Sequence, residues 1–331
     1  MKKKIFFLAQ FAPTDGHPVK RATPEEEFYA TTYHEKIYEV LQKSEYDFYS
    51  TNRVDDLLKM HSDYDLVWSL YNRIGFRNCE VFVQSLCEYL NIAYIGAPPN
   101  IRALVEDKSL SKLLAEHLGI STPKWVVASS DYPLSSLSPF QGPYFVKPRF
   151  GSASIGIDES CLCQTWEAAT KKSREYFERN IDIIVEEFID GTLYGVPILN
   201  TLSNVPITGR PRCWTSEKKG GILTYSQKRR ADKGMTGGFS EDTYLNKALT
   251  HLALKYFGEM SPCDYTRVDF MVHKDSGIPY FLEVNLLMNL GMYSDFTNTF
   301  LESHFSSYEE IINHILQLGL SRVDRSSRGS K

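Results

Sequence analysis

Hydrophobic and polar positions in the first part of the chain follow a strand–helix alternation. Residues 5–8 and 65–70 are short apolar runs that predict buried strands, while apolar positions recur at helical spacing over residues 28–43. A further helix is predicted over residues 80–90, before a short strand at 93–96. Strands that alternate with helices are typical of a small parallel sheet, so we expect an α/β domain here.

Extended segments dominate the rest of the chain, with two helices predicted between them at residues 108–118 and 164–179. The predicted strands lie at residues 125–128, 144–148, 181–188, 194–199, 210–215, 266–272 and 278–284. Such runs of strands indicate largely antiparallel sheets with α+β character. We therefore expect four parts, at residues 1–98, 99–190, 191–320 and, as a flexible tail rich in Ser and Arg, 321–331.

Composition narrows the class of protein. With 331 residues, 42% hydrophobic and 24% charged residues and a net charge of -4, the chain is an ordinary globular protein without the basic character of a nucleic-acid binder. Gln10 interrupts the short apolar run near the start, which favours a buried strand over a signal peptide, and no stretch is long enough to cross a membrane. The six scattered cysteines are expected to be reduced thiols in a cytoplasmic protein.

Two short polar motifs near the end of the chain carry a metal-binding signal. Arg267 and Asp269 lie two positions apart in one predicted strand, and Glu283 and Asn285 lie two positions apart in the next. Side chains two apart in a strand share a face. Carboxylate and amide oxygens suit Mg²⁺, which completes its shell with water and phosphate oxygens. The alternative, favoured for either pair alone, is a hairpin with solvated polar faces.

A lysine followed by a small-residue loop forms a candidate phosphate site. Lys147 lies at the end of the predicted strand 144–148, and the loop 151–156 is rich in glycine and serine. Glycine lets backbone N–H groups approach phosphate oxygens, although no Gly-Lys-Ser/Thr sequence makes this a Walker A loop. Lys108, at a helix start, is a further candidate. Alone, such a loop is more often a hairpin connection and such a lysine a solvated charge.

The order of these motifs is more specific than any one of them. Asp-Lys at a helix start is followed by Val-Lys-Pro, Glu-Glu-Phe-Ile-x-Gly, Arg-Val-Asp-Phe and Leu-Glu-Val-Asn. Over residues 92–294 this set resembles the ATP-grasp superfamily and is most similar to D-alanine–D-alanine ligases. The resemblance implies an ATP-grasp fold, in which two sheets sandwich ATP, and a carboxylate–amine ligase that forms an acylphosphate. It also implies two Mg²⁺ ions, or Mn²⁺, on the phosphates.

The resemblance also assigns roles to individual residues. Those expected to bind ATP are Lys108, Phe145, Lys147, Ser152, Ser154, Glu186, Glu187, Phe188, Ile189 and Leu282. Those expected to hold the metal ions are Asp269, Glu283 and Asn285. Arg267 is expected to stabilise the reaction intermediate, and Lys228 to contact phosphate, although Arg229 and Arg230 compete for that role.

Departures from the family pattern concern the substrate more than the nucleotide. The family's amino-terminal Gly-Gly-x-Ser-x-Glu motif, its His-Gly-x-x-Gly-Glu-Asp-Gly stretch and its Thr-x-Pro-Gly turn are replaced by residues 11–17, 71–78 and 286–294. We therefore expect a first substrate other than D-alanine. The candidate substrate residues in these segments are His17, Arg73, Arg77, Gly291 and Ser294. His17, Arg73 and Arg77 are individually more often plain surface charges.

Three functional interpretations stay open from the sequence. The first is a ligase that joins a small-molecule carboxylate to a small-molecule amine. The second transfers the activated acid to a carrier protein. The third is a nucleotide-binding regulator without turnover, against which the complete metal set argues. A homodimer is expected from the resemblance alone, and neither a nucleic acid nor a membrane is expected as a partner.

Overall fold

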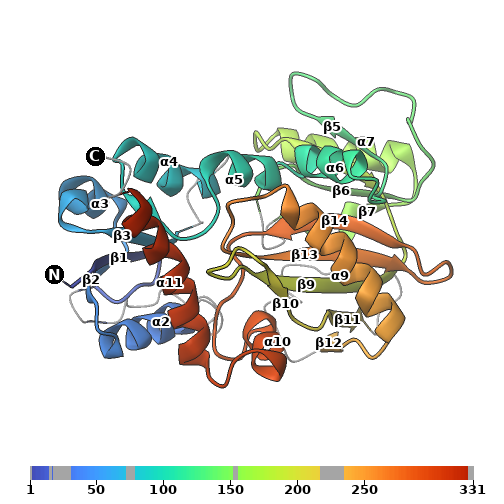
Figure 1. The fold of residues 1–331 in the computed structure, drawn as a ribbon. Coiled ribbons are helices and arrows are strands. Elements are labelled where there is room, and N and C mark those ends of the chain that lie inside the picture. Colours follow the sequence, from blue (N-terminus) through green and yellow to red (C-terminus); the bar gives the residue numbers. More distant parts are fainter. Residues whose placement is uncertain are drawn as a thin grey trace.

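The chain folds around three sheets that follow one another along the sequence (Figure 1). The structure, a computed structural model, describes residues 2–14, 17, 31–71, 79–151, 156–216 and 235–326. Figure 1 shows the first sheet beside the last helix, and the other two sheets on the opposite side of the molecule.

The first sheet is parallel, as the strand–helix alternation predicts. Its strands are β1 (Lys4–Ala9), β2 (Asp47–Thr51), β3 (Leu66–Leu70) and β4 (Ala93–Tyr94), in the order β2-β1-β3-β4. The helical elements of this region are α2 (Thr31–Lys43), α3 (Val54–Met60), η1 (His61–Asp63), η2 (Cys79–Val81) and α4 (Phe82–Tyr89). Strand β2 and helix α3 were not predicted, because β2 is short and carries polar residues among its apolar ones.

Strand β1 is apolar on both faces because each face is covered by different elements. Phe6 and Leu8 pack into one buried cluster with residues of α3 and α4. Ile5 and Phe7 point the other way, into a cluster that includes residues of α2 and of the last helix. A continuous apolar run is the expected signature of a parallel strand that is buried on both sides.

Two helices end the described part of the chain, and the second of them packs on the first sheet (Figure 1). They are α10 (Asp295–Ser303) and α11 (Tyr308–Ser326), and Ile312 and Leu316 of α11 lie in the same buried cluster as Trp68 of β3. The flexible tail expected from residue 321 is therefore wrong for residues 321–326, which continue α11. The physical reason is the ion pair of Arg322 with Asp264, which holds the last turns of the helix.

The second sheet is antiparallel, with strand order β5-β8-β6-β7. Its strands are β5 (Trp125–Ala128), β6 (Tyr144–Pro148), β7 (Leu162–Cys163) and β8 (Ile183–Glu187). Helices α5 (Pro99–Glu106) and α6 (Lys108–His117) precede it, and η3 (Glu159–Cys161) and α7 (Trp166–Phe177) are inserted within it. Helix α7 covers one face of the sheet, where its Ala169 and Tyr176 pack against Val146 and Val185.

The third sheet is the largest and is antiparallel throughout. Its strands are β9 (Gly191–Leu199), β10 (Ile207–Thr208), β11 (Arg212–Ser216), β12 (Met235–Phe239), β13 (Tyr265–His273) and β14 (Pro279–Asn285). The main path runs β12-β11-β9-β13-β14, and β10 pairs with β9. Helix α9 (Thr243–Gly258) covers one face, where Leu249 and Ala253 pack among the residues of a cluster that also includes Val196 and Val268. Arg267 and Asp269 alternate with Val268 along β13, so they lie on the opposite face.

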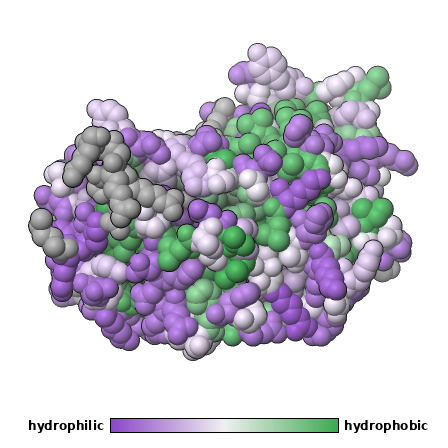
Figure 2. All heavy atoms as spheres, in the orientation of Figure 1, coloured by the Kyte–Doolittle hydropathy of each residue, from purple (hydrophilic) through white to green (hydrophobic). Residues whose placement is uncertain are grey.

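One exposed apolar region lies near helix α6. Hydrophobic residues gather there on the face drawn in Figure 2, and Leu110 and Leu113 of that helix are exposed. Among the helices in the described ranges, none combines the length and apolar character needed to cross a membrane. All six cysteines are free thiols.

Candidate active site

The polar residues of β13 and β14 lie in register across the hairpin. Arg267 pairs with Asn285 and Asp269 with Glu283, and a bulge follows Asp269. Asp269 is buried and accepts hydrogen bonds from Arg267 Nε (2.6 Å) and Nη2 (2.7 Å). Asn285 Nδ2 also donates to Asp269, at 2.9 Å. Hydrogen bonds thus connect Arg267, Asp269 and Asn285, and Glu283 lies opposite Asp269 in the register of the hairpin.

Arg267 is held between a carboxylate and an aromatic ring. Its guanidinium carbon lies 5.4 Å from the centre of the Trp214 ring, on β11. Gly195 of β9 leaves room for both, because a Cβ atom there would lie 2.8 Å from Trp214 and 2.9 Å from Arg267. Burial alone would lower the pKa of Arg267, but the adjacent Asp269 carboxylate raises it, so the cation persists. Trp214 was not predicted, since an aromatic residue in a strand usually signals only packing.

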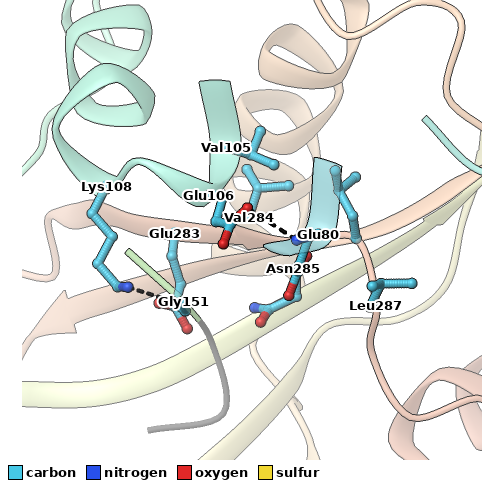
Figure 3. A pocket seen from close by; sticks show the side chains of 10 residues that line it. Glu80, Val105, Glu106, Lys108, Gly151, Glu283, Val284, Asn285 and Leu287 are labelled. Carbon is cyan, nitrogen blue, oxygen red and sulfur yellow. Dashed lines mark hydrogen bonds between the residues drawn. The ribbon is translucent and has the colours of Figure 1, made fainter. Parts of the chain in front are cut away.

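Lys108 connects helix α6 to the start of the glycine/serine loop. Its Nζ donates a hydrogen bond to the carbonyl oxygen of Gly151 at 2.5 Å (Figure 3). Burial lowers the pKa of Lys108, and the Glu283 carboxylate acts against that effect. Lys108 and Glu283, which lie far apart in the sequence, therefore interact electrostatically in the folded chain.

One pocket brings Lys108 and Gly151 together with Glu283 and Asn285. It is lined by Glu80, Val105, Glu106, Lys108, Gly151, Glu283, Val284, Asn285, Leu286 and Leu287. Figure 3 shows Glu283 between the Lys108 and Asn285 side chains, with Glu80 and Glu106 on the neighbouring wall. Elements from before, within and after the second sheet thus contribute to a single concave site, which is where ligands usually bind.

Two pocket residues, Glu80 and Glu106, were missed by sequence reasoning. Both are buried, and the Glu80 backbone N–H donates to Glu106 Oε2 at 3.2 Å. Burial, and next the Glu80 carboxylate, raise the pKa of Glu106 to about 7. No pattern in the sequence pairs these two glutamates, because they meet only through the packing of η2 against α5.

Lys147 forms a buried ion pair with a residue that was expected to frame adenine. Its Nζ lies 2.8 Å from Glu186 Oε2, and Lys112 Nζ lies 3.1 Å from Glu186 Oε1. Burial lowers the pKa of Lys112 to about 8, although Glu186 acts to raise it. Lys112 was not predicted, but its spacing of four residues from Lys108 puts both lysines on one face of α6.

Most of the other residues expected around adenine lie in or next to the second sheet, whereas Leu282 lies in β14 of the third. Phe145 and Phe188 are half-buried, with ring centres 6.5 Å apart. The backbone N–H groups of Glu187 and Phe188 already donate to the carbonyls of Lys124 and Pro143, so neither is available to an adenine edge. The role of Ile189 and Leu282 beside adenine stays a prediction.

The substrate candidates in the described ranges make local contacts, and their role toward a substrate stays a prediction. His17 is exposed and forms a two-way backbone bridge with Thr14. Ser294 is the N-cap of α10 and accepts a hydrogen bond from the N–H of Thr297, while its own N–H donates to the carbonyl of Gly291. The candidates Arg73, Arg77, Ser152, Ser154 and Lys228 lie outside the described residues.

The donor set on β13 and β14 fits a hard cation. No group of three or more His, Cys, Asp or Glu side chains in the described ranges is arranged to hold a metal by itself. Asp269 and Glu283 supply carboxylate oxygens, and Asn285, which donates its Nδ2 to Asp269, presents Oδ1. Mg²⁺ commonly takes only one or two protein carboxylates and completes its octahedron with water and phosphate oxygens, so this incomplete protein shell suits a nucleotide-bound ion.

Comparisons by sequence point to one family. The family described as D-ala D-ala ligase C-terminus matches residues 111–317, more than half of the chain. The D-alanine–D-alanine ligase of Halalkalibacterium halodurans is 30% identical over 285 residues, covering 82% of this chain and 86% of that protein. D-alanine–D-alanine ligase B of Clostridium perfringens is 28% identical over 297 residues, covering 87% of this chain and 92% of that protein.

Solved structures share the fold. The D-alanine–D-alanine ligase of Bacillus anthracis, complexed with ATP, matches with a TM-score of 0.73 at 18% identity, covering 98% of this chain and 99% of that chain. The VanG D-Ala:D-Ser ligase of Enterococcus faecalis matches with a TM-score of 0.71 at 18% identity, covering 96% and 99%. This likeness confirms the expected ATP-grasp fold class. Together with the sequence matches, it shows that the chain belongs to the D-alanine–D-alanine ligase family, whose members are ligases that form C–N bonds.

Proposed function

We propose that the chain uses ATP and Mg²⁺ to join a small-molecule carboxylate to an amine through an acylphosphate. The observation that carries this proposal is the pocket in which Lys108 of α6 and Gly151, after β6, meet Glu283 and Asn285 of β14. A lysine, a loop backbone and oxygen ligands for a cation are the groups that a bound triphosphate needs.

The reaction proceeds in two displacements. A carboxylate oxygen of the first substrate attacks the γ-phosphorus, the bond to the bridging oxygen of ADP breaks, and an acylphosphate forms. The amine nitrogen then attacks the acyl carbon, phosphate leaves, and the amine loses a proton. No covalent bond to the protein is needed, so catalysis comes from positioning and charge neutralisation.

Individual residues have distinct tasks in this scheme. Lys108 and Lys147 balance phosphate charge, and Arg267, kept cationic by Asp269, faces the oxyanion of the tetrahedral intermediate. Bound Mg²⁺, held by Asp269, Glu283 and Asn285, would supply further neutralisation of phosphate oxygens. As the resemblance to the family implies, we propose two ions, with Mn²⁺ as a substitute.

We propose that the first substrate is an acid other than D-alanine. The support lies in the sequence, where residues 11–17 and 286–294 depart from the family's substrate-binding motifs. The relatives compared above are themselves named for D-alanine, so D-alanine is the reference acid for any test. The free thiols support a cytoplasmic setting for the reaction.

The test is ATP-dependent release of phosphate over a panel of amino acids and amines, with Mg²⁺ and D-alanine as the reference. Release that requires one acid and one amine supports the proposal, and D-alanine as the best acid would overturn the substrate part alone. Release that requires a carrier protein would favour transfer to a protein. Tight ATP binding without release under any condition would favour a regulator. Light scattering of the same preparation tests the predicted homodimer.

A further inference from the structure

We propose that Asp107 and Arg149 are positioning residues that hold the phosphate lysines Lys108 and Lys147 at a fixed spacing. This inference rests on the proposed function, because it assigns these residues a task in nucleotide binding. We call the two side chains the clasp. They join the start of α6 to the chain segment that follows β6.

The clasp is a paired hydrogen bond between buried groups. Arg149 Nε donates to Asp107 Oδ1 at 2.9 Å, and Arg149 Nη2 donates to Asp107 Oδ2 at 2.6 Å. The Asp107 side chain is buried and that of Arg149 is mostly so. Burial alone would raise the pKa of Asp107, but Arg149 and Ser109 lower it, so the carboxylate is charged in the folded chain. Paired contacts of this kind fix geometry as well as adding energy.

Asp107 also has a second role, at the start of helix α6. It is the N-cap of α6, and its Oδ1 accepts from the backbone N–H of Ser109 at 2.9 Å. One carboxylate therefore sets both where α6 begins and where Arg149 lies. Because Lys108 is the first residue of α6, the direction of its side chain depends on this cap.

Lys108 itself makes two further hydrogen bonds to the chain segment that contains Arg149. The N–H of Lys108 donates to the carbonyl of Arg149 at 3.2 Å, and Lys108 Nζ donates to the carbonyl of Gly151 at 2.5 Å. Lys147 is only two residues before Arg149, at the end of β6. The spacing between the two lysines thus depends on contacts at Asp107 and Arg149, neither of which lines the pocket.

The experiment measures the dissociation constant of a non-hydrolysable ATP analogue with Mg²⁺ by calorimetry. Asp107→Ser removes the clasp but keeps a good N-cap residue, and Arg149→Met removes it from the other side with the cap intact. Each variant is expected to weaken binding about tenfold, as loss of a supporting contact commonly does. The variant with both changes should be no weaker than either alone. Arg210→Met, which breaks an ion pair with Glu302 away from α6, is the control.

A combination with Lys108→Met separates positioning from a purely structural role. If the clasp acts through Lys108, Asp107→Ser should change affinity less than about twofold in a chain that already lacks that lysine, since effects that share one route are not additive. The inference would be overturned if the two substitutions together raised the dissociation constant by the product of their separate effects. It would also be overturned if Asp107→Ser lowered the melting temperature but left the affinity unchanged. Arg149→Met gives the same decision if Asp107→Ser does not fold.

The outcome also separates this inference from the proposed function. No nucleotide binding by the unsubstituted chain would overturn both. Normal binding by the unsubstituted chain together with normal binding by Arg149→Met would overturn the clasp and leave the proposed function in place.

Discussion

Asp264 and Arg322 connect the start of β13 to the last helix. Arg322 Nη1 donates to Asp264 Oδ1 at 2.7 Å and Nη2 to Oδ2 at 2.6 Å, while Asp264 Oδ2 also accepts from the N–H of Gly96 at 2.6 Å. Asp264 is buried, and the pair connects segments from the beginning, middle and end of the chain.

Loss of Arg322 should destabilise the fold without touching the pocket. Arg322→Met leaves the buried Asp264 carboxylate without its cation, which typically costs about 3 kcal/mol or more. Because Arg322 is partly exposed and water can reach the site, we expect its loss to cost less than it would in a fully buried pair. The measurement is the free energy of unfolding in urea, with Arg322→Lys as the variant that keeps the charge. A change below about 0.5 kcal/mol in Arg322→Met would show that the pair contributes little.

Removal of one pocket carboxylate should stop turnover. Glu283→Gln keeps the size of the side chain but removes a charge from the donor set that faces Asp269, so a bound cation loses an anionic ligand. We expect ligase activity to fall below detection while the melting temperature stays within a few degrees. Glu302→Gln, at an exposed ion pair with Arg210, is the matched control. Full activity of Glu283→Gln would rule out the metal assignment.

Removal of Lys147 should act mainly on nucleotide affinity. Lys147→Met keeps the length of the side chain, and Lys112 continues to balance Glu186. A hydrogen bond to a charged group contributes about 1.5 to 3 kcal/mol, so the dissociation constant for ATP should rise about tenfold to a hundredfold. Lys36→Met, which removes only an exposed pair with Glu39, is the control. Equal ATP affinity in both variants would place the phosphates elsewhere.

Glu106 should make stability depend on pH. Burial and the Glu80 carboxylate raise the pKa of Glu106 from 4.5 to about 7 in the folded chain. Between these values the folded state binds more protons than the unfolded state. The stabilisation is therefore fully present below about 4.5 and is lost as the pH rises through about 7.

Glu106→Gln should remove this dependence. Relative to the unsubstituted chain, the variant should gain stability on going from pH 5 to pH 8, by on the order of 1 to 3 kcal/mol. Urea unfolding at the two pH values measures it, and Glu116→Gln, an exposed glutamate on α6, is the control. If the free energies of unfolding of the two chains differed by the same amount at both pH values, a raised pKa of Glu106 would be contradicted.

Those features of the site that depend on a single strand could be predicted from the sequence, because the alternation of side chains along a strand determines which residues share a face. Arg267 and Asp269 share a face of β13 because they are two residues apart, and Lys147 closes a strand whose apolar run is plain. The residue roles assigned through resemblance stay predictions. Those assigned to Ser152 and Lys228 fall outside the described residues.

The parts that could not be predicted depend on packing between distant segments. Glu80 and Glu106 meet only because η2 lies against α5, and Trp214 reaches Arg267 only because Gly195, on the strand between them, lacks a side chain. Helix α11 looks like any amphipathic helix in sequence, so its place on the first sheet was not predictable. Long-range contacts of this kind have no periodic signature.

The central claim is that Lys108, Lys147 and the donor set of β13 and β14 surround one triphosphate. The most direct measurement is a crystal structure with Mg²⁺ and a non-hydrolysable ATP analogue. We predict ions at about 2.0 to 2.1 Å from oxygens of Asp269, Glu283 and Asn285, with both lysine Nζ atoms within hydrogen-bonding distance of phosphate oxygens. A nucleotide bound elsewhere, or ions that touch none of these three side chains, would contradict the account.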